Sequence, residues 1–173
     1  MTKDLTQGKI TPLLVKFTIP LLFGNIFQLM YNSVDSIIVG QLVGKEALAA
    51  VGTSNPLMTL AILFVNGMCI GASILMGTQY GAKKMDVLKR QISTTMIAGI
   101  VFSITVTLFC ILFARPLLLL IRVQEEVLPL AVPYLRIVFL GFIFTFIYNF
   151  FACTLRALGD STTPLYFLVA SSV

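Results

Sequence analysis

The chain has 173 residues, of which 58% are hydrophobic and 11% are charged, and its mean hydropathy is +0.99. Soluble domains carry about 25% charged residues, so this composition excludes an ordinary soluble domain and indicates an integral membrane protein. The net charge of +5 comes from Lys and Arg spread over the ends of apolar segments. Because they form no dense basic face, we expect no nucleic-acid partner.

Long apolar segments predict an all-α, polytopic membrane bundle. We place spans at about residues 17–43, 48–78, 91–114 and 137–155, since a spanning helix needs about 20 apolar residues. A fifth segment, at residues 163–173, stops too early to cross. The apolar runs lack the in/out alternation of a transmembrane barrel. We therefore interpret residues 1–173 as a partial N-terminal transmembrane lobe of about four and a half helices.

The first span combines a proline with a stripe of polar residues. Thr11-Pro12 reads as its start, and Pro20, which cannot donate a backbone hydrogen bond, predicts a bend. At about 100° per residue, the stripe covers only about 80° of the helix. Its members are Asn25, Gln28, Asn32 and Asp35. Polar groups in hydrocarbon face a bundle interior or an aqueous cavity, so this stripe predicts the inward side of the span.

Asp35 is the only charged residue between Phe17 and Gly44. An ionised carboxylate in the bilayer costs a few kcal/mol, about 3 on insertion scales, and desolvation favours the neutral acid. A proton or a sodium ion would relieve the same penalty, which makes Asp35 a candidate cation-coupling residue. The alternative is a purely structural hydrogen bond to a polar side chain on a neighbouring helix. Asn149, in the fourth span, either lines the same cavity or packs between helices, and Asn66 has the same ambiguity.

The segments between the spans also carry predictions. Small residues recur at four-residue spacing at Gly67 and Gly71 and again at Ser73, Gly77 and Gly81, a pattern that lets helix backbones approach closely. Residues 81–90 read as a basic loop, residues 117–136 as an interfacial outer helix, and "RALGDSTTP" as a turn before the fifth segment. Eight of the 12 Lys and Arg residues lie on the side of the N-terminus, which predicts that the N-terminus is cytoplasmic in a plasma-membrane protein.

The sequence offers no enzyme constellation. There is no second acid within the spans, no His in the whole chain and no glycine loop with a phosphate-binding Lys. Cys69, Cys110 and Cys153 lack the spacing of a metal site. We therefore expect neither catalysis nor a cofactor, and no metal beyond a possible sodium ion at Asp35.

Several motifs together resemble one transporter family. "IPLLFGNIFQLMYNSVDSIIVGQLVGKEALAAVG", Pro56, "GTQYGAKKMDVLKR" and "LRALGDSTTPL" are similar, in this order, to the N-terminal half of the multidrug and toxic compound extrusion (MATE) transporters. The resemblance implies twelve helices in two six-helix lobes, so that a missing C-terminal lobe is a partner of this chain. It also implies export of cationic or amphipathic compounds through the lipid membrane in exchange for protons or sodium ions.

The resemblance further implies roles for individual residues. Tyr31, Asn32 and Asp35 match the family motif that carries the cation-binding carboxylate, and Pro20 matches a proline associated with bending of the first helix. Acidic residues that some branches carry on helix five would fall beyond this sequence, so the coupling ion stays open. Two alternatives stay open as well: a flippase or exporter of a lipid-linked sugar in the same superfamily, and a non-transporting membrane module.

Overall fold

The computed structural model describes residues 10–42 and 45–171. Within these ranges the chain forms helices and turns and no β-strand, so the all-α prediction is confirmed. The helices in chain order are α1 (Ile10–Leu42), α2 (Lys45–Gly81), α3 (Met85–Leu112), α4 (Ala114–Leu120), α5 (Leu128–Leu140), α6 (Phe142–Ala157) and α7 (Thr163–Ser171).

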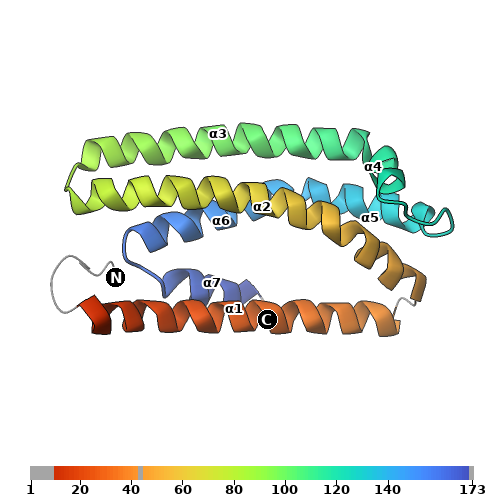
Figure 1. Ribbon diagram of the computed structural model, residues 1–173, viewed down its shortest axis with the longest axis horizontal. Helices are drawn as coiled ribbons and strands as arrows, with labels where there is room; N and C mark the ends of the chain where they lie inside the picture. The colour runs from red at the N-terminus through yellow and green to blue at the C-terminus, as the bar shows by residue number, and fades with distance from the viewer. Residues whose placement is uncertain (1–9, 43–44, 172–173) are drawn as a thin grey trace.

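The helices form a bundle around α2 (Figure 1). α2 and α3 run antiparallel beside each other, and α5 and α6 pack against both. α1 lies on the other side of α2, with α7 beside it (Figure 1). The start of α1, the α2–α3 turn and the α6–α7 turn therefore lie at one end of the bundle.

Three helices are long and apolar enough to cross a membrane, over Thr11–Tyr31, Leu48–Gly81 and Met85–Leu112. α5 and α6 pass the same test as a pair, bent by 43°. The predicted basic loop at residues 81–90 is shorter than expected. Only a turn at residues 82–84 separates α2 from α3, and Lys83 closes it with a left-handed φ of 57°.

The prediction of one interfacial helix over residues 117–136 is wrong. α4 is only 7 residues long, Arg122 turns the chain with a φ of 59°, and α5 then packs against α2, α3 and α4. Arg136 does not interrupt α5, because its Nε donates to the backbone oxygen of Ile111 at 3.2 Å. That oxygen lies in the last turn of α3, where carbonyls lack partners in their own helix.

The break between α5 and α6 lies at Gly141, inside the predicted fourth span. A break in a membrane helix leaves backbone groups that need partners from elsewhere. Here the buried hydroxyl of Thr107 on α3 donates to the backbone oxygen of Phe139 at 3.0 Å. The bend is therefore joined to α3 by a hydrogen bond across the bundle.

Buried aromatic rings fill the core where α6 meets α2 and α3. Phe146 and Phe150 are fully buried and stack with ring centroids 5.9 Å apart. Gly99 of α3 lies directly under the Phe146 ring, which occupies the space that a Cβ at this position would need. The close approach of α3 to α6 thus depends on a glycine that the sequence patterns do not single out.

The predicted small-residue face of residues 67–81 makes few close approaches in the described part of the chain. A Cβ added at Gly77 would lie 3.6 Å from the backbone oxygen of Ala157 on α6. A Cβ at Gly67, Gly71 or Gly81 would meet nothing within 4 Å. Of these glycines, only Gly77 therefore supports close helix packing in this structure.

Candidate functional site

Two members of the predicted polar stripe, Asn25 and Gln28, line a polar pocket between α1, α6 and α7. Its volume is about 130 Å³, the space of roughly four water molecules at about 30 Å³ each. The residues that line it are Pro20, Leu21, Gly24, Asn25, Gln28, Tyr148, Arg156, Ser161, Pro164, Leu165 and Leu168. We call it the α1–α6–α7 pocket.

Pro20 lies at this pocket, where α1 runs through it as a single helix. In the view of Figure 1, α1 runs without a visible bend. Pro20 still cannot donate the backbone hydrogen bond that would reach the carbonyl of Lys16. Its role as a hinge stays a prediction.

Two other predicted site residues, Tyr31 and Asn149, do not line this pocket in the described part of the chain. Tyr31 is 51% exposed. Asn149 is half-buried, and its Nδ2 donates to the backbone oxygen of Thr145 at 2.8 Å, within its own helix. Asn32 and Asp35 belong to α1, but their side chains lie outside the described residues.

Arg156 and Ser161 are pocket residues that the sequence analysis missed. Arg156 is exposed at the end of α6 and makes no ion pair with any described residue. Ser161 is only 6% exposed, and its hydroxyl has no hydrogen-bond partner in the described part of the chain. The only sequence signal was the turn motif "RALGDSTTP". That motif shows where α6 ends but not that its end faces α1.

Asp160, beside Ser161, makes hydrogen bonds within the turn that begins α7. Its carboxylate accepts hydrogen bonds from the backbone N–H and hydroxyl of Thr162, each at 3.0 Å. It also accepts them from the backbone N–H and hydroxyl of Thr163, at 3.0 and 2.7 Å. Burial alone raises the pKa of the Asp160 carboxyl, but the hydrogen bonds from Thr163 and Thr162 outweigh it and hold the pKa well below its usual range. The carboxylate therefore orders the turn that begins α7.

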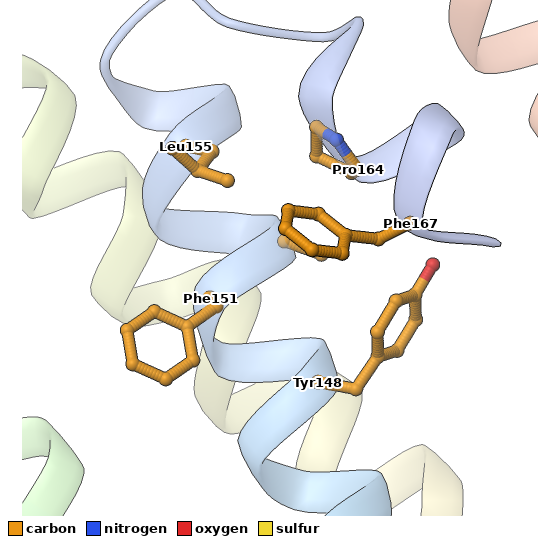
Figure 2. A pocket seen from close by; sticks show the side chains of 6 residues that line it. Tyr148, Phe151, Leu155, Pro164 and Phe167 are labelled. Atoms are coloured by element: carbon orange, nitrogen blue, oxygen red, sulfur yellow. The ribbon is translucent and has the colours of Figure 1, made fainter. Parts of the chain in front are cut away.

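A second, apolar pocket lies directly beside the polar one. It has a volume of about 420 Å³ and is lined by Tyr148, Phe151, Ala152, Leu155, Pro164 and Phe167. Figure 2 shows the rings of Tyr148 and Phe167 in the space between α6 and α7. Tyr148 and Pro164 line both pockets, so the polar and apolar spaces adjoin.

The described residues contain no group of three or more His, Cys, Asp or Glu side chains that could hold a metal ion. The possible sodium site at Asp35 lies outside that search. The chemistry visible at the pocket is hydrogen bonding, from the amides of Asn25 and Gln28 on α1, and positive charge, from Arg156 on α6.

Comparison with known proteins identifies the family to which the chain belongs. Residues 20–173 match the MatE family. The chain is 33% identical over 98% of its length to the probable multidrug resistance protein YpnP of Bacillus subtilis, and 36% identical over 91% to the probable multidrug resistance protein YoeA of the same organism. It spans 38% and 34% of those two proteins, little more than a third of their length.

A solved structure shares the fold across nearly the whole chain. It is a MOP superfamily transporter from Pyrococcus furiosus, described as having a binding pocket of reverse polarity. The TM-score is 0.90 at 26% identity, and the match covers 99% of this chain and 38% of that one. Together with the long apolar helices, these similarities identify an integral membrane protein.

Proposed function

Since this chain belongs to the MatE family of membrane transporters, we propose that it is the N-terminal part of a secondary antiporter. The complete protein exports cationic or amphipathic toxic compounds across the plasma membrane, in exchange for protons or sodium ions. Its N-terminus is cytoplasmic. Two relatives named as probable multidrug resistance proteins support the class of cargo, and the family consists of transporters rather than enzymes.

The observation that carries the proposal is the polar stripe of α1. Asn25 and Gln28 are exposed amides on a mainly apolar helix, and both line a pocket shared with α6 and α7. Amides at such positions are stable in a membrane when they face a cavity. Asp35 follows Gln28 by seven residues, about 10 Å along the helix, on the same predicted face.

Asp35 is the coupling residue in this proposal. Without a cation the carboxylate is desolvated and strained, and a bound proton or sodium ion removes that penalty. Loading and release of the cation therefore change the relative stability of two arrangements of α1. A conformational equilibrium can be shifted only by such a difference in binding free energy. Pro20, which leaves one helical hydrogen bond of α1 unmade, is the hinge.

The experiment is dye efflux from cells that express the complete protein, comparing the wild type with Asp35→Asn. The neutral amide cannot bind a proton or attract a cation, so we expect efflux to fall to the level of cells without the transporter. Asp86→Asn is the matched control, because it removes an exposed carboxylate from the first turn of α3. It should leave efflux unchanged.

Efflux by Asp35→Asn at the wild-type rate, with equal amounts of protein in the membrane, would overturn the coupling role. The ion follows from a second measurement on the wild type in liposomes. A sodium antiporter responds to an imposed sodium gradient at constant pH, whereas a proton antiporter responds to a pH gradient without sodium.

A further inference from the structure

We propose that the α1–α6–α7 pocket and the apolar pocket beside it form one binding site for an anionic phospholipid. The phosphate binds Arg156 and Ser161, and an acyl chain lies against Phe151 and Phe167. The export cycle proposed above relies on Asp35 and Pro20. The lipid site shares the α1–α6–α7 pocket with the polar stripe of α1 and adds Arg156 and Ser161, which that cycle does not use.

The charge of the polar pocket selects an anion. Among the described residues, Arg156 is the only charged side chain that lines it, and it makes no ion pair with them. The nearest acid in sequence, Asp160, holds hydrogen bonds from Thr162 and Thr163 instead. A guanidinium group presents several N–H donors in one plane, a geometry that suits a phosphate.

The hydroxyl of Ser161 supplies a second donor. Ser161 is 6% exposed as a residue and lines the pocket together with Arg156. A serine hydroxyl can donate one hydrogen bond and accept others. A phosphate oxygen at this position would satisfy the hydroxyl, and the amides of Asn25 and Gln28 can donate from the facing side of α1.

The adjoining apolar pocket identifies the anion as a lipid. A free phosphate would fill the polar space and leave the larger space of about 420 Å³ empty. The rings of Phe151 and Phe167 and the side chain of Leu155 line that space, as Figure 2 shows. Tyr148 and Pro164 border both pockets. A polar head and an apolar chain joined in one molecule match this pair of pockets.

The position of the site at the end of the bundle agrees with a lipid head group. The α6–α7 turn lies at the same end as the α2–α3 turn (Figure 1), which carries Lys83 and Lys84. By the excess of basic residues this is the predicted cytoplasmic end. Basic pockets between membrane helices on the cytoplasmic side bind anionic head groups.

The test is native mass spectrometry of the complete transporter, purified in a neutral detergent and incubated with phosphatidylglycerol, phosphatidylcholine or inorganic phosphate. We expect the wild type to retain phosphatidylglycerol in preference to the zwitterionic lipid. Arg156→Gln should lower the bound fraction about tenfold, the usual effect of losing a charged hydrogen bond. Ser161→Ala should lower it less, with the charge intact.

Arg90→Gln is the matched control, because it removes an exposed arginine from the same end of the bundle without touching the pocket. It should bind as the wild type does. If Arg156→Gln does not fold, the retention of phosphatidylglycerol is compared between the wild type, Arg156→Lys and Ser161→Ala instead, since both variants keep the positive charge.

Three outcomes would overturn the proposal. The first is equal retention of phosphatidylglycerol by the wild type and all pocket variants. The second is a loss of lipid in Arg90→Gln as large as that in Arg156→Gln, which would indicate a diffuse surface charge. The third is binding of inorganic phosphate that displaces phosphatidylglycerol, which would assign the site to a dissolved anion. Because the readout is binding, the result does not depend on whether the protein exports drugs.

Discussion

Replacing Gly99 with alanine tests how closely α3 must approach α6. The new methyl group would overlap the ring of Phe146. Because that ring is fully buried and stacked on Phe150, it cannot swing aside without disturbing the core. Overpacking of this kind costs about 1–3 kcal/mol. The gain in helix propensity from Gly to Ala offsets about 1 kcal/mol of this cost, so we expect a net loss of up to about 2 kcal/mol.

The measurement is reversible unfolding of the purified complete protein in mixed micelles, followed by circular dichroism. Gly71→Ala is the control, because a Cβ there meets nothing within 4 Å, and it should be neutral or slightly stabilising. Phe146→Leu in the Gly99→Ala background should recover part of the loss, since the smaller side chain leaves room for the methyl group. The packing argument is refuted if Gly99→Ala is as stable as Gly71→Ala. It is also refuted if the stability changes of Gly99→Ala and Phe146→Leu simply add in the double variant.

Two further predictions concern single hydrogen-bonded groups. Thr107→Val removes the donor to the Phe139 carbonyl and should lower the free energy of unfolding of the complete protein by about 1 kcal/mol. Thr107→Ser keeps a hydroxyl and should lower it less. Equal losses in the two variants would argue against the hydrogen bond. The lowered pKa of Asp160 contributes stability that is complete above the unfolded pKa of about 3.9 and is lost as the pH falls through the folded pKa. Thermal unfolding between pH 7 and pH 3 should therefore show a decline at the acid end that Asp160→Asn reduces, and an unchanged decline in the variant would count against this role.

The long helices could be predicted from the sequence because their apolar runs are uninterrupted. α5 was missed because charge and proline within residues 117–136 resemble the end of a membrane segment. Local patterns do not show that Arg136 reaches the unpaired carbonyl of Ile111, a contact between residues 25 positions apart. Long basic side chains can place their charge several ångströms from their own backbone, so a charge alone does not end a helix.

The sequence predicted the residues of the candidate site on α1 but not those on α6 and α7. Helical spacing alone placed Asn25 and Gln28 on one face, and both line the pocket. Arg156 and Ser161 complete it from a distant part of the chain, and their position depends on how α6 and α7 pack against α1. The glycines show the same limit, since four-residue spacing indicated residues 67–81 while the tight contact lies at Gly99.

The hydrogen bonds near the bend at Gly141 join α5 to α3. Thr107 and Arg136 make these two bonds about one helical turn apart, so a displacement of α5 would pull on α3 at both points. By contrast, no described side chain between Thr11 and Tyr31 of α1 is buried. The α1–α6–α7 pocket lies between α1 and the two helices α6 and α7. A ligand bound there would contact α1 and α6 at once, and would favour the arrangement of α1 in which both contacts are made.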